Sequence, residues 1–186
     1  RFDLARLVLE RKYRWAKRTL YQLTPVRRDE GTLSVDKFYR LYHGPQADTW
    51  SDKEFVGALW HEVNHLMRHH HDRLSHLPQR DNMNPTVANL AADLEINDDL
   101  AKQGVVLPEG LYYSPMVGHD EFQSAEEHFA RFVEEYEPPP PSAGGNGEGE
   151  GAPGPDGPPQ PGSNGPDQDP KCGSGSGGTG EGEEPE

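Results

Sequence analysis

The chain has 186 residues, a formal net charge of −14 and a hydrophobic content of 32%, below the roughly 45–50% that is usual in globular proteins. An acidic chain is repelled by nucleic acid and by anionic membranes, so we expect neither as a partner. The single cysteine, Cys172, cannot form an internal disulfide, and no transmembrane run or secretory signal is visible, so we expect a cytoplasmic protein.

The hydrophobic deficit is concentrated at the carboxyl end. Residues 138–186 contain no Leu, Ile, Val, Met or aromatic residue. They hold nine acidic residues against one basic residue, a net charge of −8, which leaves −6 for the first 137 residues. Such a composition cannot bury enough apolar surface to offset the entropy lost on folding. We therefore expect one folded domain over residues 1–137 and a disordered low-complexity tail over residues 138–186.

The first predicted element is a helix over residues 3–23. Apolar residues recur there at helical spacing and can line one side of the helix: Leu4, Leu7, Val8, Trp15 and Leu20. The basic residues between them are interpreted as a solvated face. Thr24 and Pro25 are predicted to end the helix.

A β-hairpin over residues 32–43 and three further helices complete the predicted folded part. Two short runs of β-branched or bulky residues flank a turn at Asp36, which is typical of a hairpin. Helices are predicted over about 52–74, 85–102 and 125–136, and the first and last of them begin with a capping-box pattern. This order of elements predicts an α+β fold that is mostly helical with a small β-hairpin or sheet.

The predicted helix over residues 52–74 contains the motif HEVNH at positions 61–65. Residues four apart lie on one face of a helix, so His61 and His65 can bind the same metal ion. Glu62 beside them can act as a general base on an attacking water. At about 100° per residue, the two histidines lie about 40° apart and the apolar residues lie opposite them. The alternative is a surface histidine pair on an amphipathic helix.

Three more histidines, His69, His70 and His71, follow in the same predicted helix. On the helical wheel His70 points into the apolar side, and of the three only His69 lies near the metal face, at about 80°. Asp72 also falls on the metal face, at about 20°. A solvated or packing role is the favoured interpretation of the three histidines, and a ligand role is the alternative.

A catalytic zinc ion usually has three protein ligands and one open position, so a third ligand must come from another segment. In the predicted helix over residues 85–102, Asp93 and Asn97 lie on the inward, apolar face of the wheel. A carboxylate on a buried face needs a partner, and we expect Asp93 to bind the metal rather than to pair with a buried arginine. Asn97, one turn later, is placed to orient a ligand histidine.

Glu95 is the competing candidate for the third ligand. Glu95 and Asp99 have the Glu-x-x-x-Asp spacing of the zinc peptidases that use a glutamate ligand. However, the wheel places Glu95, Asp98 and Asp99 on the outward face. We therefore expect Glu95→Ala to leave metal binding nearly unchanged.

Several segments occur in a specific order: TLSVD at 32–36, HEVNH at 61–65 with Arg73 downstream, and AADLEIN at 91–97, followed by LPEG at 107–110 and SAEE at 124–127. This ordered set resembles a bacterial metallopeptidase family with a zincin-like domain. Members of the family typically carry a von Willebrand factor A-like domain after the peptidase-like domain. The resemblance covers nearly all of residues 32–136.

The resemblance implies a zincin-like fold with His61, His65 and Asp93 as zinc ligands and Glu62 as general base. It also implies a MoxR-type AAA+ ATPase as a partner. The von Willebrand-like domain is absent from this chain, and the Gly-rich stretch around residues 171–174 resembles the linker that would precede it. We therefore interpret the chain as consistent with an N-terminal fragment.

Two functions are consistent with these residues. The favoured one is zinc-dependent hydrolysis of a peptide or protein substrate. One hairpin strand could hold the peptide by strand addition, and Tyr112 or Tyr113 could supply an oxyanion donor, although packing is the favoured role of both tyrosines.

The alternative is a metal-stabilised, non-catalytic interaction module that works with a MoxR-type AAA+ ATPase. Glu62 favours the enzyme, because a structural metal site gains nothing from a general base. Structural zinc sites are also usually closed by four protein ligands, often cysteines, and the predicted folded part contains no cysteine.

Overall fold

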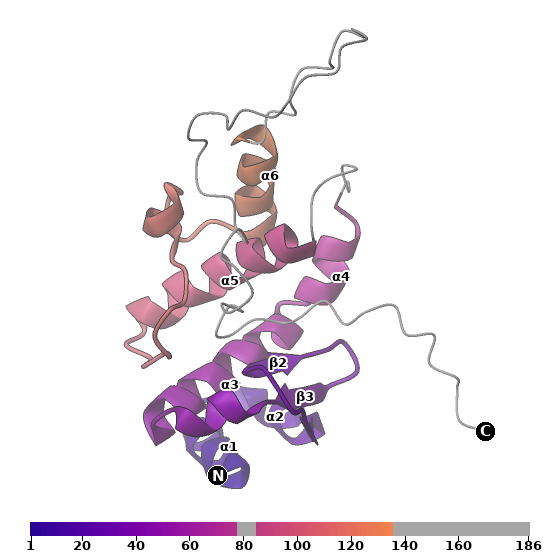
Figure 1. The fold of residues 1–186 in the computed structure, drawn as a ribbon, viewed down its shortest axis with the longest axis vertical. Helices are drawn as coiled ribbons and strands as arrows, with labels where there is room; N and C mark the ends of the chain where they lie inside the picture. The colour runs from indigo at the N-terminus through magenta and orange to yellow at the C-terminus, as the bar shows by residue number, and fades with distance from the viewer. Residues whose placement is uncertain (78–84, 136–186) are drawn as a thin grey trace, which may run out of the picture.

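A computed structural model, which describes residues 1–77 and 85–135, confirms that the fold is α+β and mostly helical with a small sheet (Figure 1). Helices form most of the fold, and three strands form the sheet. The α-helices are α1 (Phe2–Lys12), α2 (Lys17–Gln22), α3 (Asp52–Met67), α4 (His70–Ser75), α5 (Pro85–Lys102) and α6 (Ala125–Glu135). Short 3-10 helices are η1 (Arg14–Ala16), η2 (Pro45–Thr49) and η3 (Ser114–Val117). Within the described residues no helix combines the length and the apolar character needed to cross a membrane.

Helix α3 is the central element and carries the HEVNH motif. It begins at the predicted capping box: Glu54 N donates to Ser51 Oγ at 3.3 Å, and Ser51 N donates to Glu54 Oε2 at 2.7 Å. These two bonds satisfy main-chain donors that the first turn leaves unpaired. Helix α3 contacts α1, β2 and α5, and almost every residue from Gly57 to Leu66 is buried. The motif therefore lies in the interior rather than on a surface helix.

The sheet contains the predicted hairpin and one strand that was not predicted. Strands β2 (Leu33–Val35) and β3 (Arg40–His43) pair antiparallel, as expected. Strand β1 (Thr24–Arg27) pairs parallel with β3, which gives the order β1-β3-β2. Strand β1 was missed because Thr24 and Pro25 were read only as the end of a helix. A parallel pairing depends on a distant partner, so local sequence does not reveal it.

The predicted helix over residues 3–23 is wrong in two respects. It is broken after Lys12 into α1, η1 and α2, and the apolar side named for it is mostly exposed. Of the residues named for that side, Leu20 is buried as predicted, but Trp15 is 69% exposed and Leu4, Leu7 and Val8 are also exposed. The other buried residues of these elements each follow an expected one by a single position: Ala5, Leu9 and Ala16. The alanines allow α1 and η1 to lie close to the core, and the break changes the helical phase that the wheel assumes.

The predicted single helix over residues 52–74 is also interrupted. Helix α3 ends at Met67, and His69 adopts the left-handed conformation (φ 56°, ψ 36°) before α4 begins. A residue with a side chain is uncommon in this conformation. Wheel positions assigned beyond Arg68 therefore fail: His69 and Asp72 are exposed and do not lie on the metal face.

The predicted disordered tail over residues 138–186 lies outside the described residues, and its dispensability stays a prediction. A chain truncated after Glu137 should melt within a few degrees of the full chain, because the tail has no Leu, Ile, Val, Met or aromatic side chain with which to dock. Differential scanning calorimetry of both proteins measures this. A fall of more than about 5 °C, equivalent to roughly 1 kcal/mol in a domain of this size, would show that the tail stabilises the fold.

Candidate metal centre

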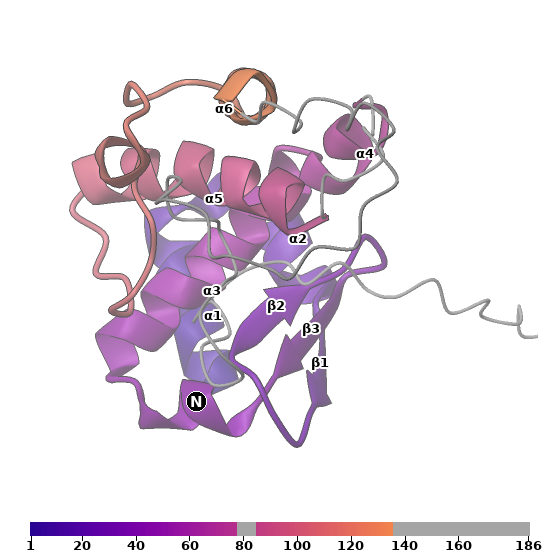
Figure 2. The ribbon, with the colours of Figure 1, turned by 45° about the horizontal axis from the view of Figure 1, so that its top comes forward.

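Helices α3 and α5 bring together the three predicted metal ligands. His61 and His65 lie one turn apart on α3, and Asp93 reaches them from α5, which packs along α3 (Figure 2). The two Nε2 atoms are 2.9 Å apart. Asp93 Oδ1 lies 3.3 Å from His61 Nε2 and 3.0 Å from His65 Nε2. All three side chains are buried.

This triangle of ligand atoms fits a metal ion. With zinc–ligand bonds of 2.0–2.1 Å, two ligands of a tetrahedral site are about 3.3 Å apart. The three observed separations, 2.9, 3.0 and 3.3 Å, are close to that value. Asp93 Oδ1 is also buried without a well-formed hydrogen bond from the described residues. A buried carboxylate oxygen in this position can be compensated by a cation.

Asn97 orients His61, at the position where the helical wheel predicts it. Its Oδ1 lies 2.9 Å from His61 Nδ1, and its Nδ2 donates to the carbonyl oxygen of Tyr112 at 3.0 Å. Because the amide nitrogen is used by Tyr112, the amide oxygen accepts from His61 Nδ1–H. That tautomer leaves the lone pair of His61 Nε2 directed at His65 and Asp93, as a metal ligand requires.

The charges around the triad favour a cation. Burial opposes protonation of His61, but hydrogen bonding and charge from Asp93, with the charge of Glu62, outweigh burial and raise the pKa of His61. Burial lowers the pKa of His65 to about 3, which keeps this imidazole neutral. Burial opposes ionisation of Asp93, but its contacts with His61 and His65 lower its pKa. The site therefore combines the Asp93 carboxylate, the neutral imidazole of His65 and the imidazole of His61, whose affinity for a proton is raised. A metal ion bound at the triad would compete with a proton for His61.

Glu62 is fully buried on α3, directly after His61. Its charge contributes to the raised pKa of His61, so the two groups lie close enough to interact.

The two predicted oxyanion donors, Tyr112 and Tyr113, are less clearly placed than Glu62. Tyr112 is 46% exposed, and Tyr113 packs partly buried against the core. Their proposed catalytic role stays a prediction.

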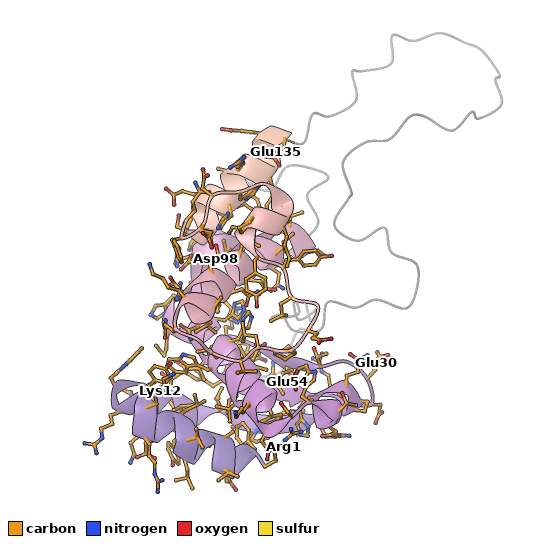
Figure 3. The ribbon with its side chains drawn as sticks, turned by 90° about the vertical axis from the view of Figure 1, so that its left-hand side faces the viewer. Arg1, Lys12, Glu30, Glu54, Asp98 and Glu135 are labelled. Atoms are coloured by element: carbon orange, nitrogen blue, oxygen red, sulfur yellow. The ribbon has the colours of Figure 1, made fainter. Side chains whose placement is uncertain are left out.

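The prediction that Glu95, Asp98 and Asp99 face outward is wrong for two of the three. Asp98 is 3% exposed and accepts from the backbone N–H groups of Ser114 and Phe122, at 3.2 and 3.3 Å. The Glu95 side chain is 13% exposed, whereas that of Asp99 is 39% exposed. The wheel assumes a single core, but α5 is packed between α3 and α6 (Figure 2). Figure 3 shows Asp98 in the α5–α6 layer, away from Glu54 at the start of α3.

Glu95 is engaged by arginines rather than placed in the triad. Its carboxylate lies 2.8 Å from Arg68 Nη1 and 3.2 Å from Arg73 Nη2, and it accepts from Ala125 N at 2.6 Å. Arg73 also pairs with Glu126 at the start of α6. These contacts join the end of α3 to α4, α5 and α6 beside the candidate metal centre. Burial opposes ionisation of Glu95, but its contacts with His70, Arg68 and the backbone N–H of Ala125 outweigh burial and lower its pKa.

His70 contacts His65 of the candidate metal centre, and the helical wheel does not predict this contact. His70 is 1% exposed, and its Nδ1 lies 3.2 Å from Nδ1 of His65. The wheel placed His70 on the opposite side of the helix, and only the left-handed residue His69 turns it back. No glycine or proline between residues 66 and 71 marks that break in the sequence.

Asp93→Asn should weaken zinc binding by more than about 100-fold, because loss of an indirect partner of a zinc ligand already costs 10–100-fold. Asp99→Asn is the matched control, since its carboxylate lies on the same helix and pairs with Arg68 instead. Competition titration with a chelating dye gives both dissociation constants. Equal affinities for the native chain and Asp93→Asn would remove Asp93 from the site.

The chain belongs to the family described as "Putative metallopeptidase domain", whose model matches residues 3–186. The match confirms the expected resemblance to a metallopeptidase family. No curated protein and no solved structure shows a significant match.

Proposed function

We propose that this member of the metallopeptidase-domain family is a zincin-like, zinc-dependent hydrolase of peptide bonds. One observation carries the proposal: His61, His65 and Asp93 converge within 3.3 Å of one another, and Glu62 is buried beside them on the same helix. Two imidazoles and one carboxylate are a ligand set of catalytic zinc sites, which keep a fourth position open.

Each residue of the centre has a distinct role in this proposal. A zinc ion, when bound, would polarise the scissile carbonyl and acidify the attacking water. Glu62 accepts a proton from that water and delivers it to the leaving amine. Asn97 holds the His61 ring so that Nε2 faces the site. Burial keeps these charges in a low-dielectric environment, where they act more strongly than in water.

Strand β2 is a suitable place for an extended peptide substrate. It is an edge strand of the sheet and lies along α3, the helix that carries the motif (Figure 2). Thr32 and Asp36 bond with the β3 side of the hairpin, so the backbone groups of Leu33 and Val35 point to the open edge. Those groups could pair with a substrate strand while the two side chains stay buried against the core.

Cleavage of a peptide mixture by the zinc-loaded chain tests the proposal. Mass spectrometry should detect new peptide termini that disappear after chelation and return when zinc is added. A chain that binds zinc but cleaves nothing would instead favour the interaction module that works with a MoxR-type AAA+ ATPase. Copurification with such an ATPase, dependent on zinc, would then be the expected result.

A further inference from the structure

Two buried histidines and the half-buried carboxylate of Glu95 form a line from the candidate metal centre into the ion-pair network beside it. His65 Nδ1 lies 3.2 Å from His70 Nδ1, and His70 Nε2 lies 3.4 Å from Glu95 Oε2. The two imidazole rings meet edge to face, with centroids 5.2 Å apart. Both histidines are at most 1% exposed. The far side of His65 therefore contacts a protein group rather than solvent.

The backbone adopts an uncommon conformation that makes this contact possible. In an uninterrupted helix His70 would lie about 140° around the axis from His65, on the other side. The left-handed conformation of His69 ends α3 and starts α4 so that His70 faces back toward His65. Strained backbone of this kind persists where the surrounding structure enforces it, often beside functional sites.

The hydrogen atoms on this line follow from the role of His65 in the proposed function. His65 Nε2 faces His61 and Asp93, so it must present a lone pair to a metal, and the ring proton is then on Nδ1. His70 Nδ1 accepts that proton in a hydrogen bond. The proton of His70 is consequently on Nε2, which faces Glu95 Oε2 across 3.4 Å in an electrostatic contact rather than a well-aligned hydrogen bond.

Glu95 is firmly held at the other end of the line. Arg68, Arg73 and the backbone N–H of Ala125 all donate to it. These partners belong to three different segments, so the carboxylate is fixed relative to α3 and α5, the two helices that supply the triad. Its negative charge can polarise His70 and, through it, His65.

We propose that His70 and Glu95 are positioning residues of the metal centre. Glu95 holds His70, and His70 accepts from His65 Nδ1–H, which fixes the tautomer and the direction of that ligand. His65 is thus oriented through an imidazole and a carboxylate, whereas His61 is oriented by the amide of Asn97. This inference rests on the proposed function, because it requires a metal ion at the triad.

Substitution of His70 tests the inference through metal affinity and a metal spectrum rather than through activity. His70→Phe fills similar space but cannot accept from His65, and it should weaken zinc binding by about 10–100-fold. It should also change the visible absorption of the cobalt-loaded chain, because the His65 ring is free to turn. His70→Gln offers a carbonyl oxygen and should recover part of the affinity and of the native spectrum.

Glu126→Gln is the control for a merely structural effect. It weakens the ion pair with Arg73, but it leaves in place the His65–His70 contact and the bonds that Arg68 and Ala125 N donate to Glu95. Glu126→Gln should keep the native zinc affinity and cobalt spectrum even if it lowers the melting temperature of the metal-free chain as much as His70→Phe does. Equal effects of Glu126→Gln and His70→Phe would overturn the inference.

Two further outcomes are distinct. If His70→Phe binds zinc as tightly as the native chain and gives the same cobalt spectrum, His70 does not position His65. If the native chain binds neither zinc nor cobalt, the proposed function fails and the inference fails with it. Glu95→Ala should weaken zinc binding by about as much as His70→Phe does. The helical wheel predicts instead that Glu95→Ala leaves zinc binding nearly unchanged.

Discussion

Changing both His61 and His65 to alanine should abolish zinc binding. The native chain should contain one zinc ion per molecule by elemental analysis after dialysis, and the double variant none. Each histidine supplies one of three ligands, and a single remaining carboxylate cannot hold the ion against water. The loss should be complete because both Nε2 atoms, 2.9 Å apart, face the same point.

A second buried histidine pair provides the matched control. His119 and His128 are 4% and 0% exposed, and their Nδ1 atoms are also 2.9 Å apart. His128 Nε2 lies 3.2 Å from Ser114 Oγ and His119 Nε2 lies 3.7 Å from Glu135 Oε2, and these groups do not converge as the His61, His65 and Asp93 ligand atoms do. The variant with both of these changed to alanine should retain zinc if it stays folded by circular dichroism. Zinc retained by the His61/His65 variant, or lost only from a folded His119/His128 variant, would contradict the assignment.

Glu62→Gln should retain one zinc ion and the native melting temperature but lose hydrolysis. Glutamine has nearly the same shape and cannot accept the proton of the attacking water, so turnover should fall by roughly 10²–10⁴-fold. The measurement is the rate of cleavage of the best peptide found for the native chain, with zinc content determined on the same sample.

Glu54→Gln is the matched control for that experiment. Glu54 lies on the same helix, but it caps the N-terminus of that helix, about two turns before the motif. Its substitution should leave turnover close to native. Undiminished turnover in Glu62→Gln, with cleavage still inhibited by chelation, would exclude Glu62 as the general base.

The parts of the site that the sequence predicted depend on local helical geometry. The spacing of His61 and His65 places them on one face of any helix, and the same geometry places Asp93 and Asn97 one turn apart. The structure brings all four together because both helices bury those faces against each other. Capping boxes at Ser51 and Ser124 likewise depend on residues only three apart.

The features that were missed depend on contacts between distant segments. Strand β1 forms only because β3 is available beside it. Among the α5 carboxylates, Asp98 is buried and Glu95 is half-buried because α6 and the segment before it cover a face that one helix alone would expose. The break at His69 is enforced by tertiary packing, since an intrinsic preference of histidine for that conformation is weak.

Anomalous diffraction at the zinc absorption edge, from crystals of the zinc-loaded chain, would locate the metal ion. We expect one strong peak, about 2.0–2.2 Å from His61 Nε2, His65 Nε2 and an Asp93 carboxylate oxygen. A structure with that peak absent, or with the zinc bound elsewhere such as between His119 and His128, would contradict the assignment of these three ligands.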